Sequence, residues 1–293
     1  MAANSLSYQF KMAPITVKII AINLVIFLLV PLIAFLFKLN AESLVSWAVL
    51  PAELDALIKQ PWSLLTYSFL HGDFWHIFFN MILLYWFGNI ILNLFNAKRF
   101  TTIYLLGAMA GGALYVLAYN LFPVFSNASG NLRGASAAVL AILVFIAAYA
   151  PNTQVRIFMF NIKVWHIAVV MVVKDIIFLS DDGGNNAGGL VAHLGGALFG
   201  YVYARQLVKG NDIGRWFENG MDWFVNLFKP RTKKPFKKVH RTTRPSSQRS
   251  KQSPSKDEHQ KKIDSILDKI GKSGYESLTK AEKDFLFKAG KED

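Results

Sequence analysis

Long apolar stretches, separated by short polar connections, make up most of the first 210 residues. A helix that crosses a bilayer needs about 17–25 mainly apolar residues. Six stretches meet this requirement: residues 16–37, 75–95, 101–122, 134–150, 162–180 and 188–208. None shows the period-2 alternation of a membrane barrel strand. The pattern predicts an all-α, polytopic membrane protein with a bundle of six transmembrane helices.

The composition supports a membrane protein and excludes chemistry that depends on cysteine. Of the 293 residues, 53% are hydrophobic, which is more than a soluble core of this size needs. The chain has no cysteine, so disulfides, thiolate catalysis and cysteine-bound metals are excluded. Glycines recur in the second, third, fourth and sixth stretches, where small residues let membrane helices approach closely.

The distribution of charge indicates which loops lie on each side of the membrane and where the regions of the chain begin and end. The loops at Lys98-Arg99 and Arg156–Lys163 are basic, whereas the loops on the opposite side are mainly acidic. The positive-inside rule therefore places both termini in the cytoplasm. We expect three regions: a six-helix membrane domain over residues 1–210, a basic and largely disordered cytoplasmic linker over 211–256, and a small helical hairpin over 257–293.

The linker and hairpin have patterns of their own. Between Pro230 and Lys256 there are ten basic residues and no acidic one. This favours contact with an anionic lipid surface over nucleic acid, because no aromatic pattern accompanies the charges. Thr279 and Glu282 have the spacing of a capping box before the second helix of the hairpin.

Two loops also have distinctive compositions. Residues 38–74 are apolar for an outward-facing connection, so we expect short helices in the membrane interface. Residues 180–188 are rich in glycine and asparagine. A mobile cap over a site and a plain connecting loop both fit this segment.

Ser136 lies near the start of the shortest apolar stretch, residues 134–150, which Pro151 ends on the cytoplasmic side. About 17 residues make about 25 Å of helix, less than the roughly 30 Å of a bilayer core. The other end should therefore lie below the outer surface. Ser136 would lie in the first turn, where free backbone N–H groups favour negative charge. A small packing residue between helices is the alternative.

His193 lies inside the sixth stretch, where a histidine is a functional candidate by default. Gly196, Ala197 and Gly200 share its helix face, so a neighbouring helix can approach until a serine reaches the imidazole. A neutral imidazole can take a serine proton and return it to a leaving amine. A histidine that only bonds a backbone carbonyl is the alternative.

His76 and Asn80 are four residues apart and share one face of the second stretch. They offer donors for an oxyanion, each typically worth about 3 kcal/mol of barrier. No metal site is expected at His71 and His76, because no carboxylate or third ligand lies in register, and no cofactor is expected. Lys174 and Asp175 are adjacent, so we expect them to face a wet cavity or the surface separately.

The motifs together resemble those of the rhomboid family of intramembrane serine proteases. They are H-x-x-x-N, G-x-S-x and A-H-x-x-G-x-x-x-G, formed by His76, Asn80, Gly134, Ser136, Ala192, His193, Gly196 and Gly200. The resemblance covers residues 15–208, with the order and number of spans. The basic linker and hairpin resemble the tails of some bacterial members, which implies the bacterial inner membrane.

The resemblance implies a catalytic dyad of Ser136 and His193 without an acidic third member. It implies oxyanion donors from the Ser136 backbone, His76 and Asn80. Helix packing is implied for Gly134, Gly196 and Gly200. It further implies a water-filled cavity open to the outside, a fifth span that controls substrate access, and single-span membrane proteins as substrates.

The sequence departs from the best-known bacterial pattern at three places. Ala137 replaces a glycine after the serine, Leu140 replaces a tyrosine that often stacks on the histidine, and Trp62-Ser63 replaces Trp-Arg. None removes a reacting group. We expect an intramembrane serine endopeptidase. The alternatives are a catalytically silent relative that binds transmembrane helices as a chaperone or adaptor, and a solute transporter, which would show inverted repeats.

Overall fold

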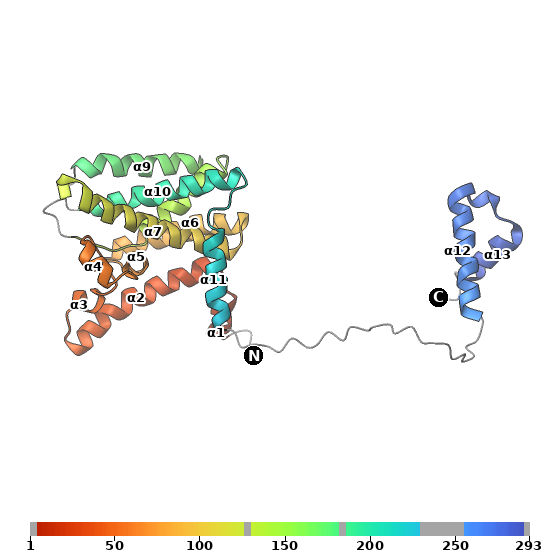
Figure 1. Cartoon of the computed structure of the whole chain (residues 1–293), viewed down its shortest axis with the longest axis horizontal. Coiled ribbons are helices and arrows are strands. Elements are labelled where there is room, and N and C mark those ends of the chain that lie inside the picture. The colour runs from red at the N-terminus through yellow and green to blue at the C-terminus, as the bar shows by residue number, and fades with distance from the viewer. Residues whose placement is uncertain (1–4, 126–129, 182–185, 229–254, 290–293) are drawn as a thin grey trace. The chain divides into compact units, whose positions relative to one another are not determined.

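The computed structural model describes residues 5–125, 130–181, 186–228 and 255–289. Contacts between residues divide the chain into two units, Met1–Pro230 and Arg231–Asp293. The first unit holds the long helices (Figure 1). Most of the predicted linker, residues 229–254, lies outside the described residues, so the region boundaries stay predictions.

Helices occupy all six predicted stretches. They are α2 (Ile15–Phe37), α6 (Phe74–Leu94), α7 (Ala97–Leu121), α8 (Ser136–Tyr149), α9 (Val164–Asp181) and α10 (Ala187–Val208). Among the described residues, 4 helices are long and apolar enough to cross a membrane, namely α2, α6, α7 and α10. Helix α8 is shorter, and α9 carries Lys174 and Asp175. The prediction of an all-α polytopic membrane protein is confirmed, whereas the count of six spans stays a prediction.

Glycines set the distance between α10 and α8 at the centre of the bundle. A Cβ added at Gly196 would overlap the carbonyl of Ala137, and one added at Gly200 would overlap the carbonyl of Ala141. Both carbonyls belong to α8, so the two backbones touch along one face of α10. Most side chains of α8 are buried as a result.

Short elements connect the long helices. Between α2 and α6 lie α3 (Ala41–Val45), β1 (Leu50–Pro51), α4 (Leu54–Lys59), α5 (Ser63–Thr66) and the 3-10 turn η2 (Tyr67–Phe69). The short helices expected there are present, on the left of Figure 1. After α7 come η3 (Pro123–Phe125) and β2 (Asn131–Leu132), and a hairpin of β3 (Gln154–Ile157) and β4 (Phe160–Lys163) joins α8 to α9. Strand β2 pairs antiparallel with β1, Leu132 opposite Leu50, and ties the loop to the start of α8.

Helices also lie outside the six stretches. Helix α1 (Leu6–Met12) precedes α2, and α11 (Arg215–Leu227) follows α10. The second unit is a hairpin of α12 (Ser255–Ser273), η4 (Tyr275–Ser277) and α13 (Lys280–Ala289). Its predicted capping box is formed, because the Thr279 N–H donates to Glu282 Oε2 at 2.7 Å. This bond, with the neighbouring Lys269, lowers the pKa of Glu282 to about 2.

Candidate active site

Ser136 is the first residue of α8, and its side chain is half-buried. The first backbone hydrogen bond of the helix runs from the Val139 N–H to the Ala135 carbonyl at 2.9 Å. The N–H groups of residues 136–138 therefore have no partner within the helix, and they favour a negative charge at this end. With 14 residues, α8 is only about 21 Å long.

His193, in the second turn of α10, contacts an acid that the sequence pattern does not assign to the site. Its Nδ1 lies 2.9 Å from Oδ2 of Asp175 on α9. The Asp175 side chain is 1% exposed and the His193 side chain 18%. Because a carboxylate only accepts hydrogen bonds, the proton of a neutral ring is on Nδ1, and Nε2 is the acceptor. This is the tautomer that a general base requires.

Asp175 differs from expectation in two respects. Adjacent helical residues diverge, yet Lys174 Nζ lies 2.7 Å from Asp175 Oδ1, because the long lysine side chain can fold back. The resemblance also implies no acidic third member, whereas a buried carboxylate contacts His193. The sequence held one signal for this: a carboxylate inside an apolar helix is costly unless it is paired.

Ser136 and His193 come from helices in direct contact. Gly196, one turn after His193, packs on the backbone of Ala137, the neighbour of Ser136. The two side chains therefore lie at the same end of the bundle. Within the described part of the chain, no hydrogen bond joins the Ser136 hydroxyl to the His193 ring. The structure thus places the two residues on adjacent helices, without a direct bond between them.

Two of the predicted oxyanion donors, His76 and Asn80, lie on α6, next to the start of α8, which carries the third, the Ser136 backbone. A Cβ added at Gly134 would meet Nε2 of His76 at 2.6 Å and Oγ of Ser136 at 3.6 Å. The His76 ring and the Ser136 hydroxyl thus flank one backbone position, where φ is +128°, a value that favours glycine. The buried Asn80 amide donates to the His76 carbonyl at 2.8 Å, and its second N–H remains for another acceptor.

His71 supports the turn before Ser136. The Ala135 N–H donates to Nε2 of His71 at 3.5 Å, and the rings of His71 and His76 are 5.0 Å apart between centroids. Burial, together with the neighbouring His76, lowers the pKa of His71 to about 3. The ring is therefore neutral near pH 7 and acts as an acceptor for the backbone.

An ion pair holds the segment immediately before Gly134. Arg133 bonds both carboxylate oxygens of Glu42, at 3.0 and 2.7 Å. The Arg133 guanidinium lowers the pKa of Glu42, and Glu42 raises that of Arg133. The outward loop is also fixed by Trp62, whose Nε1 donates to the Trp47 carbonyl at 2.7 Å. Loop anchoring is thus present although Trp-Arg is replaced by Trp62-Ser63.

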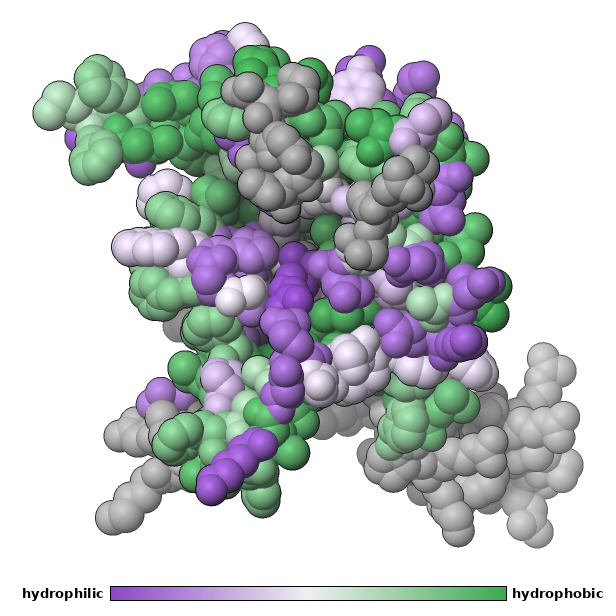
Figure 2. All heavy atoms as spheres, turned by 90° about the vertical axis from the view of Figure 1, so that its left-hand side faces the viewer, coloured by the Kyte–Doolittle hydropathy of each residue, from purple (hydrophilic) through white to green (hydrophobic). Residues whose placement is uncertain are grey.

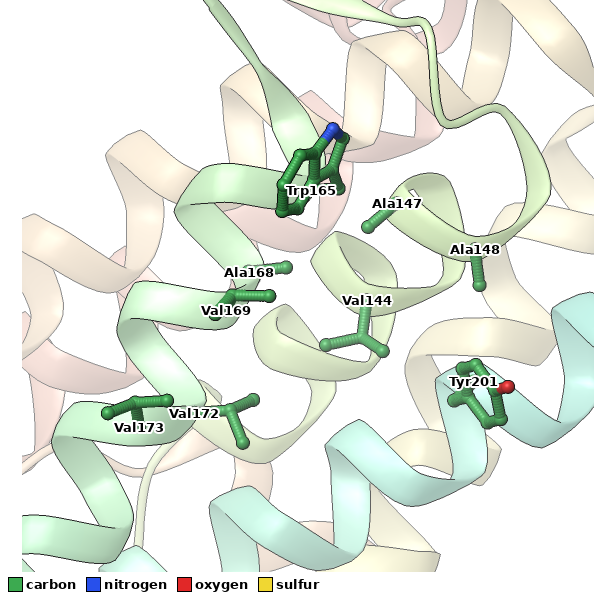
Figure 3. A pocket seen from close by; sticks show the side chains of 9 residues that line it. All are labelled: Val144, Ala147, Ala148, Trp165, Ala168, Val169, Val172, Val173 and Tyr201. Carbon is green, nitrogen blue, oxygen red and sulfur yellow. The ribbon is translucent and has the colours of Figure 1, made fainter.

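The end of the bundle that carries these residues is polar at its centre. Figure 2 shows hydrophilic residues across the middle of this face and hydrophobic residues toward its upper and lower parts. A separate recess of about 370 Å³ lies between α8, α9 and α10 and is lined by apolar side chains such as Val144 and Val172 (Figure 3). It lacks an acid–base pair and begins two turns beyond Ser136. Among the described residues, no three His, Asp or Glu side chains converge as metal ligands.

Fold and site together define a helical membrane protein with a serine at a helix start and an acid-bound histidine on the adjacent helix. The model of the Rhomboid domain family matches residues 59–210, just over half of the chain. The chain belongs to this family. A model for a family of unknown function (DUF6576) matches residues 251–289, the hairpin.

Two curated relatives are similar over the membrane domain. Rhomboid protein 1, mitochondrial, of Saccharomyces cerevisiae is 27% identical over an alignment of 174 residues, which covers 53% of this chain and 47% of the relative. RHOMBOID-like protein 12, mitochondrial, of Arabidopsis thaliana is 29% identical over an alignment of 160 residues, which covers 50% of this chain and 47% of the relative. The chain spans about half the length of the curated relatives it matches. The predicted family is confirmed.

Proposed function

We propose that the chain is an intramembrane serine endopeptidase that cleaves single-span membrane proteins. Membership of the Rhomboid domain family supports a function of this type. The observation that carries the proposal is the contact between the buried Asp175 carboxylate and Nδ1 of His193. This contact favours the tautomer of a general base, beside the helix that begins with Ser136.

In the proposed reaction, Oγ of Ser136 attacks the scissile carbonyl carbon while Nε2 of His193 takes the hydroxyl proton. The oxyanion that forms accepts hydrogen bonds from the Ser136 backbone, the His76 ring and the Asn80 amide. Cleavage of the C–N bond then releases the amine, which takes the proton from His193. Asp175 is a positioning residue, because it orients the ring and balances the positive charge of the imidazolium.

The second half of the reaction removes the acyl group. A water molecule attacks the ester on Ser136, His193 takes a proton from this water, and the proton returns to Oγ. The Ser136–His193 hydrogen bond, open in the described state, would close with substrate bound, as catalytic hydrogen bonds often do. Leu140 cannot stack on His193 as a tyrosine would, so the ring depends on Asp175 instead.

The finer location and organisation are part of the same proposal. The charge pattern supports cytoplasmic termini, and the tail resemblance supports a bacterial inner membrane. The proposed partners are transmembrane substrates and the lipid bilayer. The proposed regions are the membrane domain over 1–210, the linker over 211–256 and the hairpin over 257–293.

The proposal is tested with purified protein in liposomes that contain a labelled single-span substrate. A fluorophosphonate probe reports the reactive serine independently of substrate access. We expect cleavage and labelling by the wild type, and loss of both in Ser136→Ala and His193→Ala. Ser46→Ala is the matched control, since Ser46 lies on the exposed loop and its hydroxyl bonds only the Ser43 carbonyl.

Two results would contradict the proposal. Labelling that persists in Ser136→Ala would place the reactive group elsewhere. A wild type that neither labels nor cleaves any of several model substrates would favour the silent chaperone or adaptor. In that case Ser136→Ala and His193→Ala would leave the capture of transmembrane helices unchanged.

A further inference from the structure

Helix α11 has one polar face and one apolar face. Arg215, Asn219, Asp222 and Asn226 recur at helical spacing on the polar face. The opposite face carries a group of aromatic and aliphatic side chains: Trp216, Phe217, Met221, Trp223, Phe224 and Leu227. Trp216 and Trp223 are 65% and 66% exposed, so the rest of the described unit leaves this face largely uncovered.

Ion pairs hold α11 against one end of the bundle. Arg99 bonds Glu218 through Nε at 2.7 Å and Asp212 through Nη2 at 2.6 Å, and Lys98 pairs with Asp222. Lys98 and Arg99 belong to the first turn of α7, the end of that helix away from the Ser136 site. The polar face of α11 is therefore held where the long helices end.

The orientation of α11 is consistent with a position at the end of the long helices. Figure 1 shows α11 across the axes of the long helices, at the end of the bundle opposite α3 and α4. A helix perpendicular to membrane-spanning helices runs along the plane of the membrane. Amphipathic helices rich in tryptophan and phenylalanine occupy this position with their apolar face among the lipid headgroups and upper acyl chains.

We propose that α11 lies in the membrane interface opposite the Ser136 site and binds an anionic phospholipid surface. The apolar face supplies the contact with acyl chains. The charge comes from the sequence that follows, where ten basic and no acidic residues lie between Pro230 and Lys256. Basic segments next to a membrane helix are attracted by anionic headgroups. This inference does not depend on whether the protein is catalytically active.

The absence of cysteine from the chain allows single spin labels on the full-length protein. Gly220→Cys and Leu227→Cys place labels on the apolar face, and Gly220 has no neighbour within 4 Å of an added Cβ. Asn219→Cys and Asn226→Cys are matched controls on the polar face. Each variant is placed in nanodiscs of phosphatidylcholine alone or mixed with phosphatidylglycerol, and label access to oxygen and to a water-soluble nickel chelate is measured.

We expect the apolar-face labels to be open to oxygen and protected from the nickel chelate, with the reverse for both controls. Protection should increase when phosphatidylglycerol is added. Equal access of the nickel chelate to both faces would overturn the interfacial position. Protection that does not change with phosphatidylglycerol would overturn the anionic preference. Dipolar broadening between labels of two copies would show that a second copy, and not lipid, covers the face.

Discussion

Replacement of Asp175 by asparagine tests the proposed site most directly. The Asp175→Asn change keeps the shape of the side chain but removes the negative charge that faces Nδ1 of His193. The asparagine amide can also donate to Nδ1, which forces the ring proton onto Nε2. In that tautomer the ring cannot accept the Ser136 proton. We therefore expect a large fall in kcat with little change in KM.

The size of the fall follows from the geometry. The Asp175–His193 distance is 2.9 Å, and a hydrogen bond to a charged group contributes about 1.5–3 kcal/mol. At about 1.4 kcal/mol for each factor of ten, loss of this bond lowers the rate about 10- to 150-fold. The His193 side chain is 18% exposed, so water screens part of the charge. The wrong tautomer adds to the loss, up to about 10⁴-fold in enzymes with a Ser-His-Asp triad.

The assay measures kcat and KM on a single-span substrate in liposomes and, in parallel, the rate of fluorophosphonate labelling. Asp212→Asn is the matched control, because it also breaks a partly buried ion pair, with Arg99, but at the other end of the bundle. Cleavage and labelling should fall together in Asp175→Asn and stay near wild type in Asp212→Asn. An Asp175→Asn rate within twofold of wild type, in a folded protein, would refute the positioning role.

Three further outcomes are expected. Gly196→Ala should lower both Tm and activity, since the new Cβ overlaps the backbone of α8, whereas Gly220→Ala on α11 should raise stability slightly, by up to about 1 kcal/mol; equal effects of the two changes on thermal unfolding would contradict this. The pKa of Glu42 is lowered by Arg133, so the ion pair stabilises the fold above the ordinary glutamate pKa and is lost as the pH falls through the lowered value. The wild type should therefore have a higher Tm than Glu42→Gln at pH 6, from a stability difference of at most about 1 kcal/mol for so exposed a pair, and this difference should vanish in strong acid. A difference that grows on acidification would contradict the prediction. Finally, His71→Phe should lower kcat through the unsupported Ala135 N–H yet leave the acid limb of the pH–rate profile unchanged, because His71 has a pKa of about 3; a shifted limb above pH 5 would contradict its neutral role.

The sequence predicts those residues of the candidate site that interrupt an apolar stretch with a polar side chain. Ser136, His193 and His76 are polar residues in apolar stretches, and helical spacing places Gly196 and Gly200 on the face of His193. Contacts between elements distant in the sequence have no such pattern. Arg133 meets Glu42 across 91 positions, and the direction of the Asp175 side chain depends on how α9 packs against α10.

Helix α11 is not predicted from the sequence, because a long basic segment follows it. Its polar and apolar residues recur at clear helical spacing. Composition alone, however, assigns the helix and the basic segment to one linker. Only the contacts of Arg99 with Asp212 and Glu218 separate the helix from the segment that follows. Charge pairing across the bundle, which no single stretch reveals, fixes both this helix and the candidate site.

The charges of Lys174, Asp175 and His193 are arranged in a way that suits the proposed reaction. A buried carboxylate without a counter-charge would be costly. Lys174 Nζ lies 2.7 Å from the other carboxylate oxygen, so the ammonium group offsets the negative charge of Asp175. In the proposed reaction, the carboxylate already faces the positive charge that forms when His193 takes the Ser136 proton.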